Sequence, residues 1–440
     1  MAEGPTEDQH EHPGNHEGQR DETNTTHGAV NHQPHRGPDD VPAGQQSRVM
    51  LLGSGELSRE LVIAFQRLGA EVIAVERYGG APAHGIADQS LVVNMTDTEE
   101  LAAAIGRLRP NFVVSMTGEV ATDALNAAAE FGFTEVVPSA HAVLLSADRE
   151  GLRRLAADDL GLPTAPFWFA GSLDELKSVA AYAGFPLSVT PVAAEAGKAR
   201  SVLARPDDIE AAWQRAVAAS GQGAHTRVLA ETVVEIDFRV TLLTVRSYGP
   251  AGPVIEFCAP IGHREVAGGV LESWQPQALS EAAMGVAKSI AARIVKALGG
   301  RGVFGVELMV SGEEVYFCDV TALPCESGLV TLRTQRLSEF ELAARATLGL
   351  PVDTIMISPG AAQLIYAGDQ VGAARSHAAP AAPVTLADVL AVPESDVRVF
   401  GCAAGGPRRL GVALATAPDV GTARDRVRQV SAALHRLRQS

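Results

Sequence analysis

Residues 48–78, RVMLLGSGELSRELVIAFQRLGAEVIAVERY, decide the fold expected for the first ordered part of this chain. A short apolar run leads into a glycine-rich turn, then into apolar residues spaced by three to four, and then into a second apolar run. This order predicts a strand, a helix with one buried face and a second strand. The stretches LRPNFVVSMTGEV and FTEVVPSA add buried strands, with the helical stretch TDALNAAAEF between them. We therefore expect a doubly wound parallel sheet.

The chain after residue 145 follows a different pattern. A linking helix is expected first, with Ser146 as its N-cap. Several of the apolar runs that follow alternate with polar residues, as in an antiparallel sheet, and the long helical stretch 280–300 lies among them. A Pro/Ala-rich stretch near 370–385 precedes a final segment that predicts a small β structure closed by a helix. The expected parts are a disordered polar tail over 1–47, an α/β domain over 48–145, an α+β domain over 146–360 and a small C-terminal domain over 361–440.

Composition limits the classes of function. The chain has 440 residues, 46% of them apolar, which is enough for a large core and more than one domain. A formal charge of −16 argues against a nucleic-acid partner, whose phosphates need a basic face. The sequence has no run of eighteen apolar residues and no secretory signal, so no membrane partner and a cytoplasmic location are expected. Its four cysteines are too sparse for a disulfide framework.

The glycine-rich turn has two interpretations. Gly53 and Gly55 follow a strand and begin a helix, where backbone N–H groups can face an anion or a polar ligand. Glu76 ends the second strand, where a ribose-binding acid lies in dinucleotide-binding folds. The third fingerprint position holds Ser58, which departs from that pattern. A nicotinamide site and a turn that is structural or binds another small molecule both remain open.

Two carboxylates on successive strands give a stronger indication of chemistry. Glu307 lies in VFGVELMV and Asp319 in VYFCDV. In an antiparallel hairpin such residues can point to one face and share a magnesium ion, which prefers carboxylate and phosphate oxygens. Arg408 and Arg409 lie beside a glycine-rich turn, where forked donors can hold a phosphate or simply form a basic surface turn.

Taken together, these stretches resemble the ATP-grasp superfamily, and within it the formate-dependent phosphoribosylglycinamide formyltransferases of the PurT type. The resemblance runs from about residue 48 to the C-terminus. It rests on RVMLLGSGELSRE, VIAVERY, DREGLRRLAA, ESWQPQ, GVFGVEL, LVTL, LSEFEL, SPGAA and RRLGVALATA. It implies an ATP-grasp domain over 146–360, preceded by a substrate-binding domain. It also implies a homodimer and a reaction that joins formate to the amino group of glycinamide ribonucleotide through formyl phosphate, using ATP and Mg²⁺.

The resemblance also implies roles for individual residues. Those that would contact ATP are Arg149, Lys198, Glu231 and Val234. Those that would contact glycinamide ribonucleotide are Glu56, Leu57, Glu326, Arg408 and Arg409. Glu307 and Asp319 would bind Mg²⁺. It identifies no catalytic residue.

Several positions depart from the family pattern. The family's phosphate-binding lysine is Thr190, and Glu195 places a negative charge in the loop that follows. The acid that holds the ATP ribose is Arg239, so an acceptor has become a donor. The changed positions on the substrate side are Met116, Leu323, Cys325 and Cys402, and Glu119 could substitute for the acid lost at Met116 if its loop shifts.

Three hypotheses follow. The first is a PurT-like protein whose formyltransferase activity is lost or strongly impaired, because one lost charge partner in a dry site costs on the order of 100- to 1,000-fold in rate. The second is an active transformylase in which Lys198, Arg149 and the carboxylate pair suffice. The third is a nicotinamide-dependent oxidoreductase that uses the glycine-rich turn and Glu76.

Overall fold

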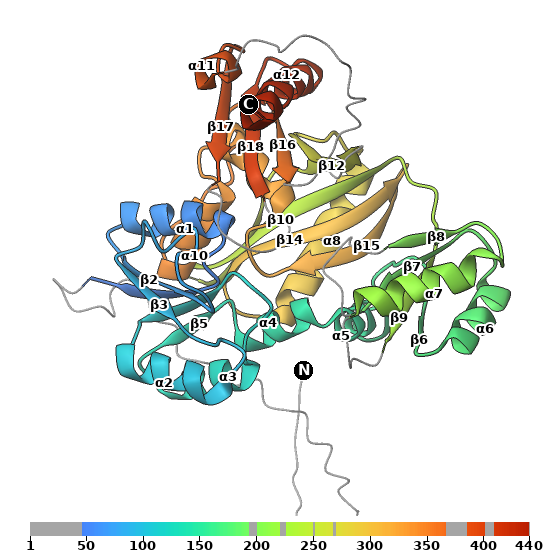
Figure 1. Ribbon diagram of the computed structural model, residues 1–440, viewed down its shortest axis with the longest axis horizontal. Helices are drawn as coiled ribbons and strands as arrows, with labels where there is room; N and C mark the ends of the chain where they lie inside the picture. The colour runs from blue at the N-terminus through green and yellow to red at the C-terminus, as the bar shows by residue number, and fades with distance from the viewer. Residues whose placement is uncertain are drawn as a thin grey trace, which may run out of the picture. The chain divides into compact units, whose positions relative to one another are not determined.

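The structure is a computed structural model and describes residues 46–192, 200–220, 226–249, 251–266, 270–366, 385–400 and 409–439. Within these residues the strands form three sheets, one parallel and two antiparallel, with helices packed on them (Figure 1). The expected mixture of α/β and α+β architecture is confirmed. No helix in this described part is both long and apolar enough to cross a lipid bilayer.

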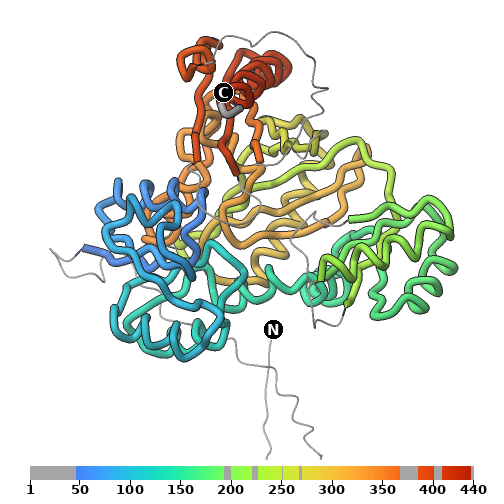
Figure 2. The backbone as a smooth tube through the Cα atoms, viewed as in Figure 1, coloured from blue at the N-terminus to red at the C-terminus, as the bar shows by residue number. Residues whose placement is uncertain are grey.

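The parallel sheet comes from the first part of the chain, as residues 48–78 predicted. Its strands are β1 (Arg48–Leu52), β2 (Glu71–Glu76), β3 (Gln89–Val92), β4 (Phe112–Ser115) and β5 (Glu135–Val137). All neighbours are parallel, and their order is β3-β2-β1-β4-β5. The blue-to-cyan part of the tube in Figure 2 follows this winding.

Alternation along β1 divides the core around this sheet into two layers. Val49 and Leu51 pack with α1 (Glu56–Arg67) and with α10 (Glu339–Leu348), which comes from much later in the chain. Met50 and Leu52 face the other way, toward α2 (Thr98–Leu108) and α3 (Thr122–Glu130). Because successive side chains of a strand point to opposite faces, one buried strand supports both layers.

The link to the central domain differs from the expected single helix. It consists of α4 (Ala140–Ala147), α5 (Arg149–Arg154) and a π-helical turn over Leu155–Asp159. Asp148 caps α5 by accepting a hydrogen bond from the Gly151 N–H at 3.0 Å, whereas the Ser146 hydroxyl donates to the Val143 carbonyl within α4. The expectation of Ser146 as the N-cap was wrong because Asp148, two residues later, is an equally good capping residue.

A four-stranded antiparallel sheet follows. Its strands are β6 (Phe167–Ala170), β7 (Leu187–Pro191), β8 (Ser201–Leu203) and β9 (Val228–Thr232), in the order β6-β9-β7-β8. The helices α6 (Leu173–Ala183) and α7 (Asp208–Ala219) pack on it around a separate apolar cluster.

The largest sheet has nine strands. They are β10 (Phe238–Gly249), β11 (Gly252–Phe257), β12 (Ile261–Val266), β13 (Val270–Gln275), β14 (Gly302–Ser311), β15 (Glu314–Thr321), β16 (Gly360–Tyr366), β17 (Ser395–Val399) and β18 (Arg409–Thr416). The main path is β15-β14-β10-β12-β13-β16-β18-β17, with β11 paired to β10. The strands from the C-terminal part therefore continue the central sheet through β13 and β16.

Helices cover this sheet along its length. The long helix α8 (Glu281–Leu298) begins after the Ser280 N-cap and packs its apolar side against β10, β14 and β15. The last helix, α12 (Val420–Gln439), packs on β16 and β18, and α11 (Leu386–Val389) contacts α12. The short helix α9 (Thr331–Thr334) follows a 3₁₀ turn over Glu326–Val330.

Candidate functional site

A large cavity of about 1390 Å³ is lined by residues of all three sheets. The parallel sheet contributes the glycine turn after β1, the four-stranded sheet contributes β7 and β9, and the large sheet contributes β10, β12, β14 and β15. Eight residues with expected roles line it: Leu57, Arg149, Glu231, Val234, Glu307, Asp319, Glu326 and Arg409. Two residues with expected roles, Lys198 and Arg408, and two altered positions, Glu195 and Cys402, lie outside the described residues.

The two carboxylates expected to hold magnesium face each other across the β14–β15 hairpin. Glu307 is the register partner of Asp319, and a bulge immediately follows, so that Cys318 has no partner of its own. Burial raises the pKa of Asp319 to about 6, and the nearby Glu307 carboxylate adds to this rise. Burial likewise raises the pKa of Glu307. Two close carboxylates that repel each other in a poorly solvated wall favour a bound cation.

A magnesium ion fits this donor set. Among the described residues no group of three or more acidic, histidine or cysteine side chains could enclose a metal. Magnesium usually takes only one or two protein carboxylates and fills its other positions with water and substrate phosphate oxygens. Glu307 and Asp319 on the wall of an open cavity match that requirement.

The end of the cavity around Glu231 contains a further arginine, which was not among the expected site residues. Arg153, only 5% exposed, donates to the Glu231 carboxylate at 2.7 Å and to the Cys318 carbonyl at 3.0 Å. Arg149 lies four residues earlier on α5 and donates to the Pro191 carbonyl at 2.6 Å. Residues four apart share one face of a helix, so the DREGLRR spacing was the signal for a second arginine here.

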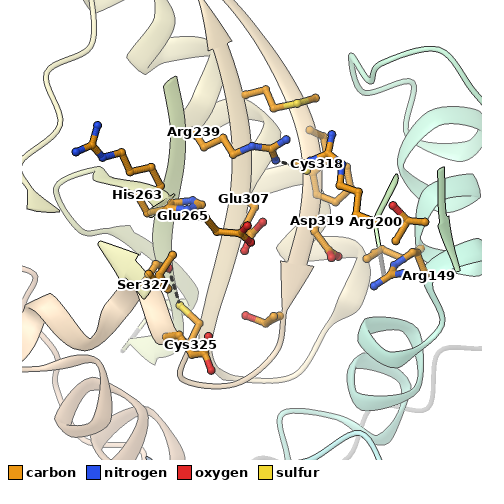
Figure 3. A pocket seen from close by; sticks show the side chains of 18 of the residues that line it. Arg149, Arg200, Arg239, His263, Glu265, Glu307, Cys318, Asp319, Cys325 and Ser327 are labelled. Atoms are coloured by element: carbon orange, nitrogen blue, oxygen red, sulfur yellow. Dashed lines mark hydrogen bonds between the residues drawn. The ribbon is translucent and has the colours of Figure 1, made fainter. Parts of the chain in front are cut away.

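Arg239, where the resemblance implies an acid, also lies in this region. Its guanidinium donates to the Cys318 thiol at 3.5 Å (Figure 3). Burial lowers the pKa of Arg239, but the Cys318 contact and the negative charges of Glu307 and Glu231 outweigh it, so the pKa rises overall. Burial, together with the positive charge of Arg239, lowers the pKa of His263 to about 4. Arg239 is therefore a permanent cation beside the carboxylate pair.

The expected substrate residues form a second charged cluster. Arg409 donates to Glu326 at 2.7 Å through Nε, and its Nη1 lies 3.5 Å from the Glu56 carboxylate. Tyr366, which was not among the expected site residues, donates its hydroxyl to the other Glu326 oxygen at 2.5 Å. These residues come from α1, the 3₁₀ turn, β16 and β18, so only the fold brings them together.

Three of the altered positions expected on the substrate side lie at the same cavity. Met116, Leu323 and Cys325 all line the cavity. The Cys325 thiol contacts the Ser327 hydroxyl at 3.3 Å, and burial raises the pKa of this thiol well above its usual value. Glu119 does not take the place of an acid at Met116, because it is exposed, is not part of the cavity lining and pairs with Arg77.

The glycine turn after β1 is held by contacts within the protein itself. Gly53 has φ +92°, and a side chain there would meet Thr117 at 3.1 Å, so only glycine fits. The Glu76 carboxylate accepts hydrogen bonds from the Ser54 N–H at 3.0 Å and the Arg77 N–H at 2.9 Å. Because Glu76 already fixes this turn, the hypothesis of a nicotinamide ribose bound there gains no support.

Comparison with known proteins agrees with this geometry. Residues 155–340 match the ATP-grasp domain family, and residues 374–434 match the PurT C-terminal family. Formate-dependent phosphoribosylglycinamide formyltransferases from Rhodococcus jostii and Corynebacterium glutamicum are 48% and 49% identical to the chain. Each alignment covers 88% of this chain and 94% of the relative.

Solved structures give the same result. The structure of glycinamide-RNase-transformylase T from Mycobacterium tuberculosis is 60% identical, covers 88% of this chain and 99% of its own, and superposes with a TM-score of 0.74. N5-carboxyaminoimidazole ribonucleotide synthetase from Thermus thermophilus, at 24% identity and a TM-score of 0.71, shares the fold. The chain belongs to the family of formate-dependent phosphoribosylglycinamide formyltransferases, built on an ATP-grasp domain.

Proposed function

We propose that this chain uses ATP to formylate glycinamide ribonucleotide with formate, at a rate well below that of relatives whose sites keep the family residues. The observation that carries the proposal is the shared cavity: the Glu307–Asp319 pair, Arg149 and the Glu326–Arg409 pair all line it. A triphosphate and a phosphoribosylamine can therefore meet in one cavity, which ATP-driven ligation requires.

The residues have separable roles in this proposal. Arg149 neutralises phosphate charge, and Glu307 with Asp319 holds Mg²⁺, which supplies charge neutralisation on the phosphate oxygens. Glu326, Arg409 and Glu56 orient the ribonucleotide. A formate oxygen attacks the γ-phosphorus and ADP leaves. The substrate amine then attacks the formyl carbon, loses a proton and releases phosphate, which carries the formate oxygen away.

Two changes account for the proposed slow rate. Thr190, on the cavity wall, has no charge to offer a phosphate. Arg239 cannot accept a hydrogen bond from a ribose hydroxyl, and its charge opposes a second cation at Glu307. Complete loss of activity is the stronger form of this hypothesis, and the same assay decides between the two forms.

The test is formation of ADP in the presence of formate and glycinamide ribonucleotide, with the R. jostii relative measured alongside. We expect turnover that requires both substrates and is at least about 100-fold slower than that of the relative. Glu307→Gln should abolish it, whereas Glu313→Gln, an exposed change in the turn of the same hairpin, should not. Equal rates for the two proteins would refute the impairment, and ADP formation independent of formate would refute the reaction.

Homodimer formation remains a prediction taken from the resemblance. Sedimentation equilibrium checks it: the prediction is a species with twice the chain mass of 45.9 kDa, and a species of single mass across the micromolar range would contradict it.

A further inference from the structure

Thr190 leaves the phosphate region of the cavity without the expected lysine, but the wall around it carries two other cations. Thr190 and Ser188 lie two residues apart on β7, so their side chains point to the same face, and both line the cavity. Arg149 binds the backbone carbonyl of Pro191, the residue after Thr190. Arg200 donates through Nε to the Ser188 hydroxyl at 2.7 Å. The two guanidinium groups are therefore anchored on either side of Thr190.

Arg200 is suited to hold an anion. Its Nε is used by Ser188, a side chain with only 1% exposure, which fixes the base of the guanidinium. In the described part of the chain its two terminal Nη groups donate to no protein acceptor, and Arg200 forms no ion pair. It lines the cavity, and Figure 3 shows it with Arg149 on the same side of Asp319. A forked donor with both ends open toward a cavity matches phosphate oxygens.

Three other arginines that line the cavity already interact with protein groups. Arg153 is bound to Glu231, and Arg409 is bound to Glu326. Arg239 contacts Cys318 and lies beside the negative charges of Glu307 and Glu231. Among these four arginines, Arg200 is the one whose Nε is held by a protein group while its Nη groups donate to no acceptor in the described part of the chain.

We infer that Arg200 binds the β- or γ-phosphate of ATP and replaces, from a different position in the chain, the cation that Thr190 does not supply. This inference rests on the proposed function for its ligand, ATP, and it identifies a binding residue that the resemblance does not provide. It also changes the expected defect: the chain should bind triphosphate well, and the slow rate should come from the region around Arg239.

The test compares the affinities of ATP, ADP and AMP, measured by calorimetry with Mg²⁺ present, for the full chain and its variants. Arg200→Gln should weaken ATP binding by about 10- to 100-fold and change AMP binding by less than about twofold, because AMP lacks the β- and γ-phosphates that reach the removed charge. Ser188→Ala, which frees the guanidinium, should cause a smaller loss of the same kind. Arg205→Gln removes an exposed arginine outside the cavity lining and should leave all three affinities unchanged.

The decisive variant is Thr190→Lys combined with Arg200→Gln. If one cation can stand for the other, this double variant recovers ATP affinity to within about threefold of the unaltered chain. Equal losses for ATP and AMP in Arg200→Gln, or no loss at all, would overturn the inference. Absence of nucleotide binding by the unaltered chain would overturn both this inference and the proposed function, whereas ATP binding without formylation would overturn only the latter.

Discussion

Removing the charge of Arg239 should strengthen magnesium binding. The guanidinium lies close enough to Glu307 to affect the titration of that carboxyl, and it approaches from β10, the neighbour of β14 in the sheet. A bound divalent ion between Glu307 and Asp319 would therefore meet a fixed positive charge. Arg239→Gln removes that charge and keeps a side chain of similar length.

The size of the effect follows from Coulomb's law. A divalent ion and a single charge roughly 6 Å apart repel each other by about 5 kcal/mol at an effective dielectric constant near 20. Solvent in an open cavity and salt reduce this value, so we expect about 2 kcal/mol, or roughly a 30-fold lower dissociation constant for Mg²⁺. The lost hydrogen bond to Cys318, long at 3.5 Å and made to sulfur, should contribute little.

The assay is a Mg²⁺ titration in the presence of a saturating non-hydrolysable ATP analogue, followed by calorimetry at pH 8. The pKa of Asp319 is about 6, so this carboxyl is ionised at that pH in the unaltered chain. Arg205→Gln controls for the change in net charge. If Arg239→Gln leaves the Mg²⁺ dissociation constant unchanged or raises it, Arg239 does not oppose the metal and the reasoning fails.

Three further predictions concern the substrate cluster, the domain contact and a buried acid. Glu326→Gln should weaken binding of glycinamide ribonucleotide by about 10- to 100-fold and leave ATP binding unaltered, because its partner Arg409 belongs to the substrate cluster; calorimetry with each ligand measures both effects. Arg301, 2% exposed, pairs with Glu135 at 2.5 Å. Glu135→Gln should therefore lower the free energy of unfolding by about 3 kcal/mol in urea titrations. A hydrophobic replacement of both residues should lower this free energy by less than the two single changes combined. Burial raises the pKa of Glu339 to about 8, so the folded chain keeps a proton that the unfolded chain releases above pH 4.5. The free energy of unfolding should therefore fall as the pH rises from about 4.5 to 8. Glu339→Gln should remove this pH dependence, which is measured from urea midpoints.

Local patterns predicted the elements that depend on neighbours in the sequence. The order strand, glycine turn, helix and strand in 48–78 was sufficient for the start of the parallel sheet, because one βαβ unit buries its own apolar face. The pairing of Glu307 with Asp319 was foreseeable for the same reason, since both lie on one hairpin.

Contacts between distant segments could not be read from the sequence. Tyr366 meets Glu326 across 40 residues, and the C-terminal strands extend the central sheet instead of forming a sheet of their own. The role of Arg200 could not be predicted from the sequence, because it depends on a hydrogen bond to the Ser188 hydroxyl, twelve residues earlier on β7. The sequence shows that Thr190 stands where a lysine is expected, and only the fold shows that Arg200 lies near Thr190 on the cavity wall.

The most direct test of the central claim is the fate of the formate oxygen. With formate labelled with ¹⁸O at both oxygens, ATP and glycinamide ribonucleotide, attack of formate on the γ-phosphorus followed by attack of the amine predicts inorganic phosphate that carries one ¹⁸O atom for each formylated product. Phosphate released without label would show simple ATP hydrolysis and would contradict the account, however tightly the cavity binds its ligands.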